Sequence, residues 1–173
     1  MNKVLFFIVL AISIMGCAVG RHNGPQDLYL QRSLAITRAV ERLANDKSFL
    51  KRYWQIRNSS NDKMPTIVVM GMRDKLLRDK LMSAIRTMEL FDIIDFEKQG
   101  AAKTHLLKIL EEGPPEDFDK LQHIGEYLFA DYVLEGEFSV QQEYQVEHYT
   151  LQMQDVKEMK LCWGSIEEVG GKD

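Results

Sequence analysis

Cysteine is scarce in this chain of 173 residues, which holds only Cys17 and Cys162. Two cysteines cannot build a disulfide framework within one chain, so the fold must depend on its hydrophobic core. If Cys17 carries a lipid, as the residues before it suggest below, Cys162 has no partner for a disulfide within the chain. Cys162 lies on a predicted strand and is expected to be a small buried apolar residue, with a reactive or intermolecular thiol as the alternative.

An excess of positive charge is also missing. The chain has 22 Lys and Arg against 26 Asp and Glu, a formal net charge of −4. If residues 1–16 are removed as a leader, as argued below, the loss of Lys3 changes this charge from −4 to −5. A mildly acidic chain with no basic tract argues against nucleic-acid binding.

Long hydrophobic runs are lacking too. The apolar run from Val4 to Met15 is shorter than the ~20 residues that cross a hydrocarbon core of ~30 Å. With Lys3 before it, the run has the form of the hydrophobic region of a secretory signal peptide. It leads into Gly16 and Cys17, where a small residue allows cleavage before a thiol that accepts a diacylglyceryl group. The alternative is an N-terminal core helix with an incidental cysteine.

The chain is therefore predicted to have three parts. Residues 1–16 form a lipoprotein signal peptide, residues 17–26 form the lipidated Cys17 and a short tether, and residues 27–173 form a single domain. Ala18 follows Cys17 and is not the aspartate that tends to retain lipoproteins in the inner membrane. We expect a lipid-anchored protein of the outer membrane, with its domain on the periplasmic face.

Catalytic motifs are absent from the sequence. It has no G-x-S-x-G elbow, P-loop, H-E-x-x-H or paired C-x-x-C. His123 and Glu126 lie three residues apart on a predicted helix, but two ligands do not make a metal site. An acidic cluster is expected to be a solvated loop and helix start, with weak calcium binding as the alternative. Its members are Glu111, Glu112, Glu116, Asp117 and Asp119.

Four aromatic residues could be exposed anchors for a binding partner. They are Tyr53, Trp54, Tyr144 and Trp163. Packing in the core or at its edge is the favoured interpretation for each. The chemistry of the sequence therefore predicts a binding module rather than an enzyme, with no catalytic residue, no cofactor, no metal and no small-molecule substrate.

Hydrophobic periodicity predicts an α+β fold, with a mixed β-sheet of about five strands packed with helices and antiparallel strands at the C-terminal end. Ile36, Ala39, Val40 and Leu43 mark one face of a helix, and Asn45-Asp46 separates it from a second helix. The strands Asp131 to Val140 and Gln145 to Asp155 alternate apolar and polar residues, which is typical of antiparallel strands covered on one side. The predicted strands are Thr66 to Met70, Phe91 to Phe96, Asp131 to Val140, Gln145 to Asp155 and Lys160 to Glu168, and the helices between them include Leu77 to Met88, Ala102 to Leu110 and Glu116 to Leu128.

An ordered set of short motifs between Pro65 and Glu168 resembles the LpoB family of penicillin-binding-protein activators, whose domain is similar to the N-terminal domain of TolB. The motifs are M-P-T-I-V-V (Met64 to Val69), L-x-x-K-L-x-x-A-I (Leu77 to Ile85), Phe91 to Asp95, A-D-Y-V-L-E-G-E-F (Ala130 to Phe138), Y-T-L-Q-M-Q-D-V (Tyr149 to Val156) and a closing strand with Trp163. The candidate lipobox at Cys17 agrees with this resemblance.

The resemblance implies an outer-membrane-anchored periplasmic lipoprotein that binds a penicillin-binding protein and activates peptidoglycan synthesis. The motifs consist of structural residues, so they do not assign the residues that bind the partner. Two alternatives remain open: a lipid-anchored periplasmic scaffold with an unrelated partner, and a secretion-associated lipoprotein that resembles the CsgG type.

Overall fold

The computed structural model describes residues 25–59, 63–111, 120–144 and 146–170, and it divides the chain into two compact units, residues 1–30 and 31–173. Of the first unit, only the helical residues 25–30 are described. The predicted signal peptide and Cys17 lie outside the described residues. Within those residues, no helix is both long enough and apolar enough to cross a membrane.

The described elements follow the order that the periodicity predicts: two helices, then a strand, a helix and a strand, then further helices, and three strands at the end. The helices are α2 (Pro25–Asn45), α3 (Lys47–Ser59), α4 (Lys75–Thr87), the 3-10 turn η1 (Phe96–Lys98), α5 (Gly100–Glu111) and α6 (Lys120–Tyr127). The strands are β1 (Thr66–Met70), β2 (Asp92–Asp95), β3 (Tyr132–Gln141), β4 (Val146–Asp155) and β5 (Lys160–Glu168). Helix α2 begins at Pro25, inside the segment predicted as tether, and proline is favoured at the first position of a helix.

The five strands form one mixed sheet in the order β2-β1-β3-β4-β5. Strand β1 pairs in parallel with both β2 and β3, and the β3–β4 and β4–β5 pairs are antiparallel. The predicted α+β fold with a mixed five-stranded sheet is therefore confirmed. Residues 67–70 of β1 are all buried, as expected of a central parallel strand with helices on both faces.

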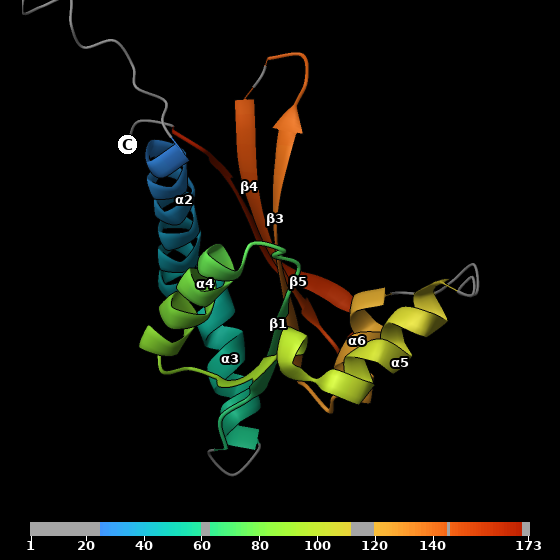
Figure 1. Cartoon of the computed structure of the whole chain (residues 1–173). Helices are drawn as coiled ribbons and strands as arrows, with labels where there is room; N and C mark the ends of the chain where they lie inside the picture. The colour runs from blue at the N-terminus through green and yellow to red at the C-terminus, as the bar shows by residue number, and fades with distance from the viewer. Residues whose placement is uncertain (1–24, 60–62, 112–119, 145, 171–173) are drawn as a thin grey trace, which may run out of the picture. The chain divides into compact units, whose positions relative to one another are not determined.

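The first face of the sheet is covered by α2, α3 and α4 (Figure 1). The predicted helical stripe of Ile36, Ala39, Val40 and Leu43 is fully buried there, or nearly so. The predicted cap between the first two helices is also present, because the Phe49 N–H donates to the Asp46 carboxylate at 2.9 Å. This face holds the larger of the two hydrophobic clusters.

Helices α5 and α6 cover part of the second face (Figure 1). Val68, Val133, Leu106 and Ile124 meet in a second hydrophobic cluster on this side. The prediction that β3 is covered on one side is therefore wrong for its first half, where Val133 is completely buried. It holds further along the strand, where Glu137 is exposed. The reason is that α5 and α6 are short and reach only the start of β3.

Candidate functional site

The candidate functional site, here called the carboxyl-edge site, lies where the parallel strands β1 and β2 end. It consists of the loop of residues 71–74 and the two hollows on either side of this loop. Residues 71–74 connect β1 to α4 across the carboxyl edge of these strands. Gly71 has φ +100°, and a Cβ added there would lie 2.7 Å from the Gly136 carbonyl oxygen and 2.9 Å from Glu135 Cγ. Both the left-handed backbone and the close approach to β3 require glycine at this position.

Asp74 fixes the other end of this loop as the N-cap of α4. One of its carboxylate oxygens accepts from the Leu76 N–H at 2.8 Å and the Leu77 N–H at 3.2 Å. Met72, between the two fixed ends, is buried. The loop is thus held at Gly71, Met72 and Asp74, while Arg73 remains exposed.

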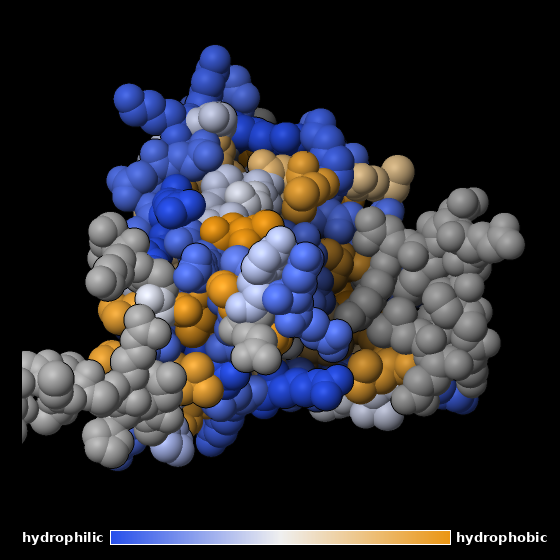
Figure 2. Space-filling view, turned by 90° about the horizontal axis from the view of Figure 1, so that it is seen from above, coloured by the Kyte–Doolittle hydropathy of each residue, from blue (hydrophilic) through white to orange (hydrophobic). Residues whose placement is uncertain are grey.

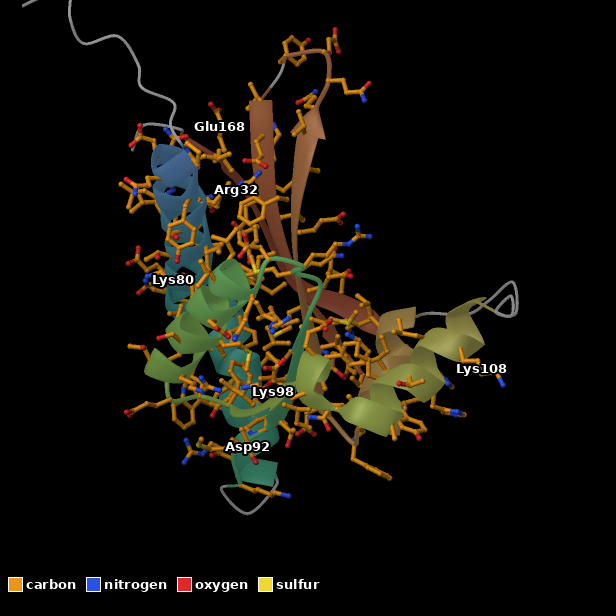
Figure 3. The ribbon with its side chains drawn as sticks, viewed as in Figure 1. Arg32, Lys80, Asp92, Lys98, Lys108 and Glu168 are labelled. Atoms are coloured by element: carbon orange, nitrogen blue, oxygen red, sulfur yellow. The ribbon has the colours of Figure 1, made fainter. Side chains whose placement is uncertain are left out.

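A hollow of about 430 Å³, here called the arginine hollow, lies on one side of the loop. Its lining includes Arg32, Leu77, Gly136, Phe138 and Glu147. The Arg32 guanidinium donates to both Glu147 carboxylate oxygens, at 2.9 and 2.6 Å, and lies 5.3 Å from the centre of the Phe138 ring. Arg32 lies between α2 and the strands β3 and β4 (Figure 3). The hydrogen bond with Glu147 raises the pKa of Arg32, against the opposing effect of its partial burial.

Tyr149 lies beneath the arginine hollow. Its side chain is completely buried, its ring packs 4.7 Å from that of Phe138, and burial raises the pKa of its hydroxyl far above the usual value. That hydroxyl has no hydrogen-bond partner within the part of the chain that the structure describes. A Cβ at Gly136 would lie 2.5 Å from the Tyr149 hydroxyl oxygen, so the ring reaches the backbone of β3 only because residue 136 is glycine.

A second hollow, of about 440 Å³, lies on the other side of the loop and is here called the methionine hollow. Met70, Met72, Phe96 and Ile124 are buried and give it an apolar floor, and the partly exposed Leu107 contributes to its lining. Its charged residues are Arg73, Lys103 and Glu97. Viewed from above, hydrophobic side chains reach the surface in patches divided by hydrophilic ones (Figure 2).

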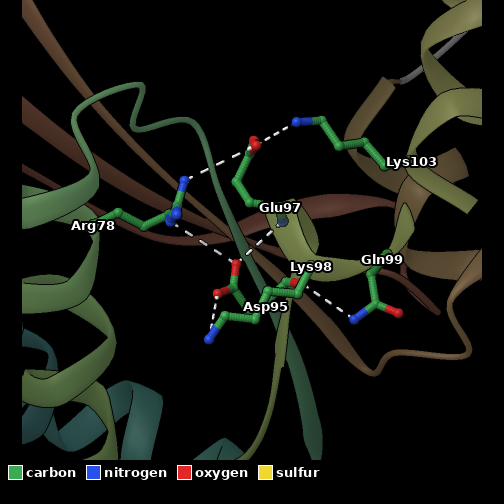
Figure 4. Close-up of polar contacts among 6 residues, drawn as sticks. All are labelled: Arg78, Asp95, Glu97, Lys98, Gln99 and Lys103. Carbon is green, nitrogen blue, oxygen red and sulfur yellow. Dashed lines mark hydrogen bonds and ion pairs between the residues drawn. The ribbon is translucent and has the colours of Figure 1, made fainter.

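The carboxylates of Asp95 and Glu97 link the elements around the methionine hollow (Figure 4). Glu97 forms an ion pair with Lys103 of α5, and Arg78 of α4 lies 3.9 Å from the same carboxylate oxygen. Asp95, which is 8% exposed, lies 3.4 Å from Lys98 and 4.0 Å from Arg78, and it accepts from the Glu97 N–H at 3.1 Å. These two carboxylates therefore already have cationic partners.

The candidate metal pair of the sequence, His123 and Glu126, lies on α6. Glu126 accepts a hydrogen bond from Gln122 on α6 at 2.8 Å. Among the residues described, no group of three or more His, Cys, Asp or Glu could hold a metal ion. Residues 112–119 and the side chain of Glu111, which make up the predicted acidic cluster, lie outside the described part.

The four candidate aromatic anchors differ in their burial. Tyr53 is completely buried, with its hydroxyl donating to the Leu90 carbonyl at 2.5 Å, and Trp163 is 8% exposed, so core packing is confirmed for both. Trp54 is 46% exposed, and its ring packs edge-to-face on that of Tyr53 with the ring centres 5.2 Å apart, so it lies at the edge of the core. The predicted packing is wrong for Tyr144, which is 64% exposed in the turn between β3 and β4.

Cys162 is half-buried on β5 rather than fully buried. Its thiol donates to the Met153 carbonyl at 3.3 Å, and burial raises its pKa to about 11. The thiolate form is therefore rare near neutral pH, which argues for a structural rather than a reactive cysteine.

The carboxyl-edge site was not predicted from the sequence. The signal that could have indicated it is Gly71 directly after the buried strand Thr66–Met70, because ligands of open α/β sheets bind beyond the carboxyl ends of parallel strands. The other lining residues come from distant parts of the chain, and no local pattern connects them.

No protein-family model and no curated protein matches the chain. Among solved structures, the LpoB C-terminal domain from Salmonella enterica aligns with a TM-score of 0.46 and 13% identity, covering 68% of this chain and 91% of that one. The LpoB C-terminal domain from Escherichia coli aligns with a TM-score of 0.44 and 16% identity, covering 61% of this chain and 82% of that one. The NMR structure of Escherichia coli LpoB aligns with a TM-score of 0.42 and 16% identity, covering 60% of this chain and 55% of that one.

Proposed function

We propose that this chain is an outer-membrane lipoprotein that binds a penicillin-binding protein in the periplasm and activates its synthesis of peptidoglycan. The chain would perform no reaction of its own in this role. The observation that carries the proposal is the ordered set of sequence motifs. They fall in turn on β1, α4, β2, β3, β4 and β5, so a single fold accounts for every motif in the set.

The carboxyl-edge site is compatible with a docking role. It combines two neighbouring hollows, an apolar floor and an exposed arginine, and aromatic and arginine residues at such places contribute much of the binding energy in protein interfaces. Several other charged groups described there are engaged with one another, as in the Arg32–Glu147 and Lys103–Glu97 pairs. Such pairs hold a surface in shape without supplying an acid or base for catalysis.

Anchoring depends on Cys17. A protein with a single acyl chain binds membranes only marginally, whereas two or more chains anchor it stably. We expect Cys17→Ser to leave an unprocessed precursor that incorporates no radiolabelled palmitate in cells. Normal maturation and labelling of this variant would contradict the lipoprotein assignment.

The anchor would also restrict the partner. The stretch from Cys17 to the first helical residue, Pro25, spans at most about 30 Å when extended. Attachment to a surface raises the effective concentration of the domain for partners that reach the same layer. The proposed synthase must therefore extend across most of the periplasm to meet the domain, and a flexible Gly/Ser insert after Cys17 should preserve or improve activation.

The test uses the purified mature chain in detergent with class A penicillin-binding proteins of its own organism. We expect direct binding by surface plasmon resonance and faster polymerisation of fluorescent lipid II. The chain alone should produce no polymer, and a penicillin-binding protein of another class should show no stimulation. Absence of both binding and stimulation with every class A synthase of the organism would refute the proposal and favour the scaffold alternative.

A further inference from the structure

The methionine hollow differs from the arginine hollow in its balance of charge. Two cations and one carboxylate line the methionine hollow, whereas two arginines and the three carboxylates of Asp74, Glu137 and Glu147 line the arginine hollow. In the arginine hollow, Glu147 binds the Arg32 guanidinium through both oxygens. In the methionine hollow, Glu97 is shared by Lys103 and Arg78. Arg73 lines both hollows, and its side chain has no ion pair or hydrogen bond within the described ranges.

We infer that the methionine hollow and Arg73 form the docking site for an acidic segment of a partner protein. One carboxylate of this segment would bind the Arg73 guanidinium, and a neighbouring apolar side chain would enter the hollow. The inference rests on the proposed function only for the identity of the partner, which we take to be a penicillin-binding protein.

The charge of the hollow argues for an acidic occupant. Its lining carries two cations, Arg73 and Lys103, against the single carboxylate of Glu97. Because Glu97 is already paired, an incoming carboxylate would meet a free guanidinium rather than displace an existing ion pair. The planar guanidinium of arginine can bind a carboxylate through two parallel hydrogen bonds, which fixes its orientation.

The floor of the hollow argues for an apolar side chain beside that carboxylate. Met70 and Met72 are 4% and 5% exposed and lie beneath a space of about 440 Å³. Methionine side chains are flexible and polarizable, and they adapt to the shape of an apolar group from a partner. Leu107 of α5, 39% exposed, adds apolar surface where this group would enter.

The length of the site argues for a polypeptide segment rather than a small ion. The two hollows share Gly71, Met72 and Arg73, so they form neighbouring depressions on either side of one loop. Beside them, Leu76 at the start of α4 is 63% exposed. A chain of several residues can follow this path with its carboxylate at Arg73, whereas a free anion would leave the apolar floor uncovered.

The first experiment locates the partner segment. The photo-reactive residue p-benzoylphenylalanine replaces Leu107 in the full chain, or Leu161 on β5 as a matched exposed control that is 61% exposed. Crosslinked peptides from cells of the native organism are then sequenced by mass spectrometry. We expect the Leu107 position, but not the Leu161 position, to capture a segment with Asp or Glu beside an apolar residue.

The outcomes separate this inference from the proposed function. An acidic segment of a protein that is not a penicillin-binding protein would support the docking site and refute the proposed partner. A penicillin-binding protein captured only from the Leu161 position would support the function and overturn the docking site. A segment without a carboxylate, or no crosslink from the Leu107 position, would also overturn it.

The second experiment measures the role of Arg73 with the captured partner. We expect Arg73→Glu to weaken binding by at least about tenfold, since arginines at interface centres are frequent hot spots. Arg86→Glu, at an exposed arginine in the last turn of α4, should change binding by less than about twofold. Replacing the captured Asp or Glu by Lys in the partner should restore binding to the Arg73→Glu chain. Equal effects of the two arginine variants at unchanged unfolding midpoints, or no rescue, would overturn the inference.

Discussion

Gly125 is a buried residue of α6 that packs closely against Val133 of β3 and Val156. A Cβ added there would lie 2.3 Å from Val156 Cγ2 and 2.9 Å from Val133 Cγ2. The second methyl of Val156 would be 3.2 Å away, so rotation of that β-branched side chain replaces one clash with another. We therefore predict that Gly125→Ala forces α6 away from the second hydrophobic cluster.

The size of the effect follows from two opposing contributions. Overpacking a close-packed core destabilises by about 1–3 kcal/mol, and the contact distances place Gly125→Ala in the upper part of that range. Replacing glycine by alanine within a helix stabilises by about 1 kcal/mol. The expected net loss is about 2 kcal/mol in the free energy of unfolding, which urea denaturation followed by circular dichroism would measure.

A double-mutant cycle tests the cause of this loss. Val156→Ala alone removes two buried methyl groups and should cost about 2 kcal/mol. In the double variant the contacts with Val156 are relieved and only the 2.9 Å contact with Val133 remains, so the two losses should fall short of additivity by at least ~1 kcal/mol. As a control, Gly164→Ala on β5 meets its nearest atom at an ordinary 3.8 Å and should not destabilise. A neutral Gly125→Ala variant, or strictly additive losses, would refute the proposed close packing.

Three further predictions test other parts of the fold. Trp163→Ala should lower the free energy of unfolding by about 3–5 kcal/mol because the ring is buried opposite Met153, and a loss below ~1 kcal/mol would mean that it is exposed. Phe129→Gly should raise the free energy of unfolding by about 0.5–1 kcal/mol, because Phe129 has φ +54° and its side chain is 90% exposed. Glycine relieves ~1–2 kcal/mol of backbone strain at this left-handed position, which exceeds the cost of the conformational entropy that it adds to the unfolded chain. Cys162 should react with iodoacetamide at pH 8 about a hundredfold more slowly in the folded chain than in urea, because burial raises its pKa from 9.0 to about 11; equal rates would contradict this.

The elements that could be predicted from the sequence are those with a local signal. The stripe on α2 and the alternation along β4 are set by residues close together in the chain, and the structure confirms both. The burial of Val133 had no such signal, because it depends on α5 and α6 packing against the second face of the sheet. Alternation shows that a strand has two different faces, but it does not show how far a helix extends over the second face.

The carboxyl-edge site could not be predicted for the same reason. Its floor combines Met70 of β1, Phe96 of η1 and Ile124 of α6, which only the parallel pairing of β1 with β2 and β3 brings together. Arg73 alone is an ordinary charged residue in the sequence. Its significance comes from the methionine hollow, where the Glu97 carboxylate is already paired with Lys103, and pairing of this kind is a property of the folded chain.

The rigidity of the 71–74 loop connects the fold to the proposed docking role. Gly71 lies against the Gly136 carbonyl, Met72 is buried and Asp74 caps α4, so the backbone on both sides of Arg73 is fixed before any partner arrives. A binding group on a fixed backbone loses little conformational entropy on association, which leaves more of its interaction energy available as affinity. The long arginine side chain still has rotamer freedom and can adjust to the partner's carboxylate. A fixed backbone with one adaptable cation, beside an adaptable methionine floor, therefore favours recognition of an acidic and apolar segment over a strict requirement for one sequence.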